Sequence, residues 1–229
     1  MEQVFLNQGE IVTKRGLCFD LDGTLIDSGR EGLKRVLKIA AVRNLPVTPE
    51  IKQRIRDMWG AEPFKLLRII WPDEDPKAFF NEWENLDIAE PLPAFPGTRE
   101  ALKKLRPYFN MSIVTNRQPR TIFAQLLHND IAEFFEQIIT PAHNGHKKPE
   151  PEIMEPIFEK YKADQIERGG IILVGDTVEN DWKLAQATGI EFYAVVSGGM
   201  DTREKFLAAG VPEDHITDSA ADLPRILLK

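Results

Sequence analysis

Two aspartates, Asp20 and Asp22, stand one residue apart at the end of an apolar run and directly before Gly23. The run Leu17–Phe19 is typical of a buried strand, and the Asp-Gly pair is typical of a turn. Side chains two positions apart on an extended chain point the same way, so both carboxylates are expected on one face. Such carboxylates repel each other unless a cation lies between them or one of them is protonated. Both arrangements serve phosphoryl transfer with Mg²⁺. The alternative interpretation of these residues is an ordinary Asp-Gly turn without a chemical role.

Further polar residues stand close to later apolar segments. They are Thr115, Asn116 and Arg117 after Met111–Val114, Lys148 before Pro149, and Asp176 and Asp181 after Ile171–Val174. Arg117 is suited to holding a substrate anion, although a solvated surface arginine would give the same pattern. Lys148 equally fits a solvated basic loop, and Asp181 fits the acidic first turn of a helix. Ligands of open α/β sheets bind beyond the carboxyl ends of the strands, so we expect these residues near one another.

The segments that must position these residues are of two kinds. Residues 28–43 and three shorter segments before residue 90 have helical patterns separated by prolines, with no strand pattern between them. After the proline-rich stretch 91–97, helices and strands alternate, which predicts a parallel sheet with helices on both faces. The expected strands are 16–20, 111–114, 137–140, 170–175 and 191–196, and helices are expected at 98–105, 152–162 and 181–187. The pattern of residues 1–14 predicts an extra strand or hairpin.

The string Cys18-Phe19-Asp20-Leu21-Asp22-Gly23-Thr24-Leu25 and the later polar residues, in this order, resemble the four motifs of the haloacid dehalogenase (HAD) superfamily. The resemblance is to its phosphoglycolate-phosphatase-like branch and runs from about Gly16 to the C-terminus. It implies that Asp20 is the nucleophile and Asp22 the acid and base. It also implies that Thr115 and Lys148 stabilise the phosphoryl oxygens.

The same resemblance implies a fold and a cofactor. The fold is α/β, with a Rossmann-like parallel sheet core at residues 1–25 and 95–229 and an inserted all-helical cap at 26–94. Mg²⁺ is expected on Asp20, the Asp22 backbone carbonyl and Asp176. Asp181 is a fourth candidate, either as a ligand or as a residue behind the ligands. The candidate substrate-binding residues are Thr24, Asn116 and Arg117.

Composition limits the classes of partner. The chain has 229 residues, a formal net charge of −7 and a pI of about 5.3, which argues against a general nucleic-acid or membrane surface. No apolar run reaches the roughly 20 residues of a membrane span. The single cysteine, Cys18, excludes an intrachain disulfide and fits a cytoplasmic location. The expected partner is a small phosphorylated metabolite, and the chain is expected to be a monomer or a homodimer.

The expected function is a Mg²⁺-dependent phosphatase that hydrolyses a small phosphomonoester through an aspartyl-phosphate on Asp20. A phosphoglycolate-like substrate is a family-level expectation, and selectivity is expected in cap loops around Trp59–Glu62. Two alternatives use the same scaffold. One is a sugar phosphomutase resembling β-phosphoglucomutase, and the other is a catalytically idle binding protein. Residues 1–14 have no assigned function.

Overall fold

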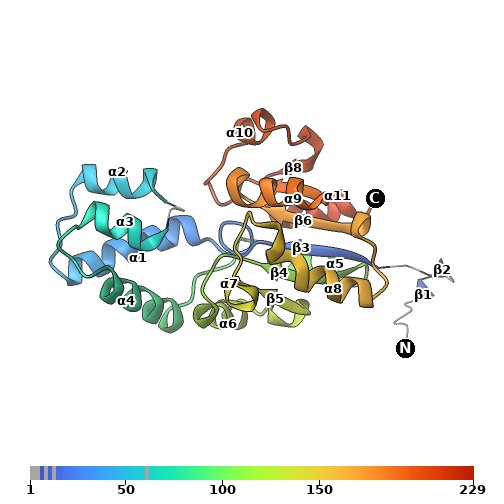
Figure 1. Ribbon diagram of the computed structural model, residues 1–229, viewed down its shortest axis with the longest axis horizontal. Helices are drawn as coiled ribbons and strands as arrows, with labels where there is room; N and C mark the ends of the chain where they lie inside the picture. Colours follow the sequence, from blue (N-terminus) through green and yellow to red (C-terminus); the bar gives the residue numbers. More distant parts are fainter. Residues whose placement is uncertain (1–5, 8–9, 12–13, 60–61) are drawn as a thin grey trace.

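The protein consists of a sheet-based core and a smaller group of helices, as the computed structural model in Figure 1 shows. The structure describes residues 6–7, 10–11, 14–59 and 62–229. Six strands form one parallel sheet in the order β5-β4-β3-β6-β7-β8. Their bounds are β3 Arg15–Phe19, β4 Phe109–Val114, β5 Gln137–Ile139, β6 Ile171–Gly175, β7 Glu191–Val195 and β8 Ile216–Thr217. The expected α/β fold is confirmed.

Helices cover both faces of the sheet, and its central strands are buried on both sides. Successive residues of β3 alternate between the two faces: Leu17 and Phe19 belong to one apolar cluster and Cys18 to the other. The first face is covered by α5 Thr98–Leu105, α6 Pro119–His128 and α11 Leu223–Leu227. The second face is covered by α8 Glu155–Ala163, α9 Lys183–Thr188 and α10 Arg203–Ala208. This burial explains why β3 and β6 consist almost entirely of apolar residues.

The helical insertion has an apolar core of its own. Its helices are α1 Ser28–Val42, α2 Pro49–Asp57, α3 Pro63–Ile70 and α4 Pro76–Ala89. Proline occupies the first turn of α2, α3 and α4, where its missing N–H would have no intrahelical partner. The rings of Trp71 and Phe79 stack 5.5 Å apart in the middle of this group. The predicted all-helical insertion after the first core strand is confirmed.

Two chain segments connect the insertion to the core, and they pair with each other. The Asp27 amide donates to the Pro93 carbonyl at 2.9 Å, and the Phe95 amide donates to the Leu25 carbonyl at 3.0 Å. These bonds tie the outgoing and returning segments together beside the sheet. The proposed division into a core of residues 1–25 and 95–229 and a cap of residues 26–94 stays a prediction.

Several elements differ in detail from the sequence expectation. β3 ends at Phe19, so Asp20 already lies in the loop. The helix expected at 181–187 begins as the π-helical turn η4 Val178–Trp182 and continues as α9. Pro156 lies in the first turn of α8, which therefore starts after the 3-10 turn η2 Pro151–Met154. Helix α10 and strand β8 were not expected, because such short elements give little periodic signal.

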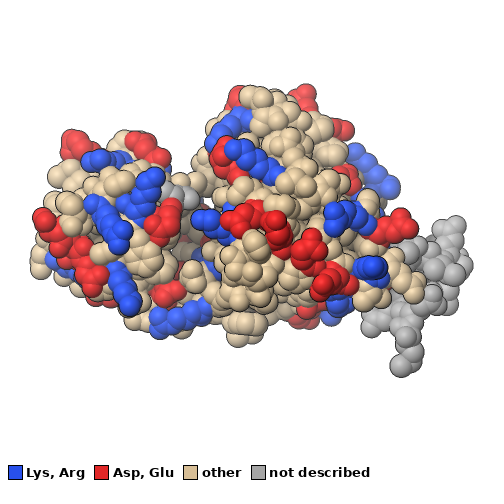
Figure 2. All heavy atoms as spheres, in the orientation of Figure 1, with Lys and Arg blue, Asp and Glu red and all other residues tan. Residues whose placement is uncertain are grey.

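Short elements complete the described chain. They are η1 Ala132–Phe134, α7 Pro141–Asn144, η3 Arg168–Gly170, η5 Glu213–His215, η6 Ala220–Asp222 and the antiparallel pair β1 Leu6–Asn7 and β2 Glu10–Ile11. That pair falls within the predicted N-terminal hairpin, of which residues 1–5, 8–9 and 12–13 lie outside the described residues. Acidic and basic side chains are interspersed on the face in Figure 2. Among the described residues, no helix is long and apolar enough to cross a bilayer.

Candidate active site

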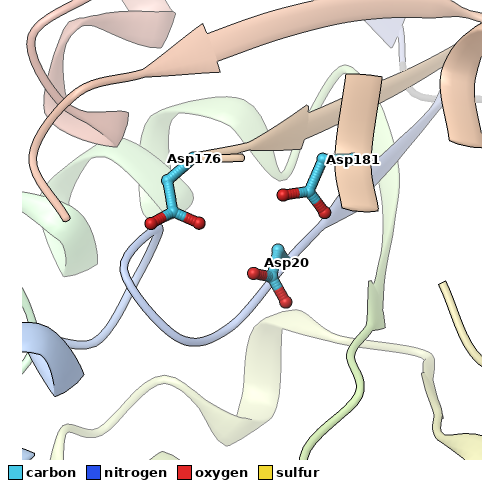
Figure 3. Close-up of side chains that lie close together, drawn as sticks. All are labelled: Asp20, Asp176 and Asp181. Atoms are coloured by element: carbon cyan, nitrogen blue, oxygen red, sulfur yellow. The ribbon is translucent and has the colours of Figure 1, made fainter. Parts of the chain in front are cut away.

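Three aspartates meet at the carboxyl ends of the central strands. Asp20 follows β3, Asp176 follows β6, and Asp181 lies in η4 just beyond Asp176. Figure 3 shows the three side chains lying close together, and one oxygen from each lies within 4.8 Å of the others. All three are buried. The parallel register of β3 and β6 brings Asp20 and Asp176 together although they are far apart in sequence.

Lys148 lies between two of these carboxylates. Its Nζ is 2.7 Å from an oxygen of Asp20 and 2.7 Å from Oδ1 of Asp181. Lys148 is only 3% exposed, whereas Lys147 is exposed. Burial alone would lower the pKa of Lys148, but the two carboxylates more than offset it and keep the ammonium charged. The other oxygen of Asp181 accepts hydrogen bonds from the amide and the hydroxyl of Thr177, so Asp181 is occupied in orienting Lys148.

Asn116 fixes the backbone of Lys148. The Lys148 amide donates to Asn116 Oδ1 at 2.8 Å, and Asn116 Nδ2 donates to the Lys148 carbonyl at 3.1 Å. The expectation for Asn116 was substrate binding, and in this structure its amide is engaged with the protein. The neighbouring Thr115 is buried, and its Oγ1 accepts a hydrogen bond from the Arg117 amide at 3.1 Å.

Asp176 differs from its neighbours in how its carboxylate is surrounded. Both of its oxygens are buried, and neither has a hydrogen-bond partner among the described residues. Two glycines confine it, since a Cβ at Gly23 or at Gly198 would overlap Asp176 Oδ2. Gly23 also has φ = +77°, which favours glycine.

The ionisation of this cluster fits a cation-binding site. Burial raises the pKa of Asp176 well above its ordinary value, and the charges of Asp20 and Asp181 raise it further. Burial likewise raises the pKa of Asp20 to about 7, although Lys148 opposes the rise. A bound divalent cation would reverse these shifts and satisfy the orphaned oxygens, and oxygen ligands suit Mg²⁺. The residues present therefore fit a magnesium site.

Asp22 lies on the side of the site that faces the helical insertion. Its Oδ1 accepts a hydrogen bond from Arg117 Nη1 at 2.6 Å, and its side chain is 32% exposed. Arg117 also forms an ion pair with Asp87 of α4, so it joins the core to the insertion. Thr24 is fully buried, and its Oγ1 has no partner among the described residues.

The structure thus groups the predicted residues into two adjoining sets. One contains Asp20, Lys148, Asp176 and Asp181, and the other contains Asp22 and Arg117. Sequence reasoning missed Asp87, which contacts the second set. A signal was present: Phe79, Trp83 and Asp87 follow one another at four-residue steps, so an acid continues the apolar stripe of α4.

The comparisons with known proteins define the class. Residues 17–195 match the family described as haloacid dehalogenase-like hydrolase, which is more than half of the chain. The chain belongs to this family and is therefore an enzyme of the hydrolase class. Within the family, its relatives include phosphatases of small metabolites.

Two such relatives and one solved structure illustrate the similarity. The glyceraldehyde 3-phosphate phosphatase of Pyrococcus abyssi is 28% identical over 192 residues, covering 76% of this chain and 78% of the relative. The phosphoglycolate phosphatase of Nitrosospira multiformis is 24% identical over 208 residues, covering 84% and 87%. The magnesium-bound HAD hydrolase YfnB of Bacillus subtilis is 20% identical, with a TM-score of 0.76 over 94% of this chain and 99% of that one. This last similarity concerns the fold.

Proposed function

We propose that the protein is a Mg²⁺-dependent phosphatase that hydrolyses a small-molecule phosphomonoester. The observation that carries the proposal is a buried cluster in which Lys148 forms an ion pair with Asp20. Beside them, the two oxygens of Asp176 have no hydrogen-bond partner in the part of the chain that the structure describes. This arrangement leaves a nucleophilic carboxylate next to a place for a cation and next to a fixed positive charge. Such a combination suits attack on an anionic phosphate.

The proposed reaction has two steps on the chain's own residues. In the first, an oxygen of Asp20 bonds to phosphorus, the ester P–O bond breaks, and Asp22 gives its proton to the leaving alkoxide. In the second, Asp22 removes a proton from water as that water attacks phosphorus. The bond between Asp20 and phosphorus then breaks, releasing inorganic phosphate and the free carboxylate.

Other residues bind and orient the phosphoryl group. Lys148 and the Thr115 hydroxyl are assigned to its oxygens, where their positive charge and dipole offset the charge that develops. Asp20, Asp176 and the Asp22 backbone carbonyl would hold Mg²⁺, which when bound neutralises the phosphate against the nucleophile. Asp181 acts behind the ligands, because Lys148 and Thr177 already occupy its oxygens.

The substrate is proposed to be a small phosphorylated metabolite. The two relatives named above act on glyceraldehyde 3-phosphate and on phosphoglycolate, which are both short phosphate esters. A compact leaving group of this kind suits a site that lies between the core and the insertion.

The test is phosphate release from p-nitrophenyl phosphate with and without Mg²⁺, for wild type and Asp20→Asn. We expect Mg²⁺-dependent release by wild type and its loss in Asp20→Asn, because an amide does not attack phosphorus. A panel of short phosphate esters then ranks the substrates by kcat/KM. Absence of release by folded wild-type protein with Mg²⁺ on all of these esters would overturn the proposal.

A further inference from the structure

Arg117 joins two carboxylates that come from different parts of the molecule. Its Nη1 donates to Asp22 Oδ1 at 2.6 Å, and its Nη2 forms an ion pair with Asp87 Oδ2. Its Nε donates to Thr121 Oγ1 at 2.7 Å. All three guanidinium nitrogens are thus engaged, and a planar guanidinium held at three points has little freedom to move.

Asp87 is itself fixed from the side of the insertion. It is 5% exposed, and its Oδ1 forms an ion pair with Arg35 of α1. Burial raises the pKa of Asp87, while Arg117 and Arg35 favour its charged form. Two arginines and two aspartates therefore form one continuous chain of contacts from α1 through α4 to Asp22.

The end of α4 is also attached to the core. Gln125 of α6 donates from Nε2 to the Asp87 carbonyl at 2.9 Å and accepts from the Leu92 amide at 2.6 Å. The position of α4 against α6 thus determines where the Asp87 carboxylate lies. Arg117 sits between that carboxylate and Asp22, so a shift of α4 must either displace Arg117 or break one of its ion pairs.

We infer that Asp87 is a positioning residue that holds Asp22, through Arg117, where it can transfer a proton to the leaving group. The inference rests on the proposed function and adds to it a residue from the helical insertion. It follows that proton transfer is productive only when α4 is seated on the core. Asp87 touches neither Asp20 nor Asp22 in the contacts described above, so its effect passes through Arg117.

The test compares two aryl phosphates whose leaving groups differ in basicity. Phenyl phosphate releases a phenolate about as basic as that of tyrosine, with a pKa near 10, whereas p-nitrophenolate is a weaker base that depends less on protonation. We expect Asp87→Asn to lower kcat/KM, which covers the step that breaks the ester bond, about 10- to 100-fold for phenyl phosphate. This is a partial loss, because general acid catalysis typically contributes about 10²- to 10⁴-fold. The loss with p-nitrophenyl phosphate should be several-fold smaller, and KM should change little.

A matched control removes another carboxylate that is paired with arginine inside the insertion. Glu82 pairs with Arg43, away from Asp22, so Glu82→Gln should leave both rates near the wild-type values. Arg117→Lys supplies a second variant, because one ammonium retains the charge but cannot keep all three contacts of the guanidinium. It should show the same dependence on the leaving group. Rates are measured below the unfolding temperature of each variant.

The outcomes separate this inference from the proposed function. Suppose that the wild-type enzyme hydrolyses both esters, and that Asp87→Asn and Arg117→Lys either slow both esters equally or slow neither compared with Glu82→Gln. That result overturns the role of Asp87 and leaves the proposed function standing. A wild-type enzyme that hydrolyses neither ester overturns the proposed function. A larger loss for phenyl phosphate in both variants, with Mg²⁺ dependence retained, supports the inference.

Discussion

The two sets of residues in the site differ in where they come from and in how they are held. Asp20, Lys148, Asp176 and Asp181 all belong to the core, and all are nearly or fully buried. Asp22 is about one-third exposed and is held by Arg117, which also depends on Asp87 of the insertion. The first set is held within the core, by the ends of β3 and β6 and by contacts from Asn116 and Thr177. The second set is shared between the core and the insertion.

This difference matches the two tasks of the proposed reaction, which are binding the phosphoryl group and protonating the leaving group. The phosphoryl group is common to every phosphate ester, so its binding residues can be rigid and independent of the insertion. The leaving group varies from one ester to another, and it lies on the Asp22 side, where the insertion contributes. Changes in the buried set are expected to affect every substrate alike, while changes in the shared set should depend on the leaving group.

Replacing Lys148 is expected to have the largest effect on the buried set. Lys148→Met should lower kcat/KM about 10²- to 10³-fold for every ester, because a charged donor to the phosphoryl oxygens is lost. It should also lower the free energy of unfolding by about 3–5 kcal/mol, since two buried carboxylates lose their counter-charge. Lys147→Met is the matched control, because Lys147 is exposed. A loss of kcat/KM in Lys148→Met that varied with the leaving group would contradict the distinction between the buried and the shared set.

The sequence predicted the buried set better than the shared one, for a physical reason. Asp20 and Asp176 of this set directly follow apolar strands, so their places could be predicted from the alternation of strands and helices. Asp87 lies inside helix α4, 30 residues before Arg117, and its contact with Arg117 depends on how the insertion packs on α6. The family, the fold class and the hydrolase class are confirmed, while the individual residue roles stay predictions.

Removing the metal should affect stability as well as activity. In wild type, Mg²⁺ should raise the unfolding temperature, because it binds the folded state only. Asp176→Asn should abolish this rise. Without metal, the same change should increase the free energy of unfolding by about 1–3 kcal/mol at neutral pH. The reason is that a neutral amide replaces a carboxylate whose ionised form is disfavoured by burial and by the charges of Asp20 and Asp181. Asp218→Asn, at an exposed aspartate, is the control in thermal unfolding with and without Mg²⁺.

The stability of the metal-free protein should depend on pH in one direction. The pKa of Asp20 is about 7 in the folded state and about 3.9 in an unfolded chain. Between these values the folded state binds more protons, so the free energy of unfolding should fall as pH rises from about 4 to about 7. Denaturant unfolding without metal, repeated across this range, measures the slope. A free energy that rose over the same range would contradict the assignment.

The smallest effect in this series is expected at Gly198, which confines Asp176 through its backbone. A Cβ at Gly198 would overlap Asp176 Oδ2 and come within 2.7 Å of Gly23 Cα, so Gly198→Ala must displace one of them. Altered support of a ligand typically costs about 10- to 100-fold in metal affinity. We therefore expect weaker Mg²⁺ binding by calorimetry and an unchanged ratio between phenyl and p-nitrophenyl phosphate.

Gly169→Ala provides the matched control for this change. A Cβ at Gly169 would meet nothing within 4 Å, and Gly169 lacks the left-handed backbone that favours glycine, so that variant should bind Mg²⁺ like wild type. If both alanine variants weakened Mg²⁺ binding equally, a general stiffening of the backbone would explain the effect better than contact with Asp176. If Gly198→Ala altered the leaving-group ratio instead, the change would have reached Asp22 of the shared set through Gly23, which a Cβ at Gly198 also overlaps.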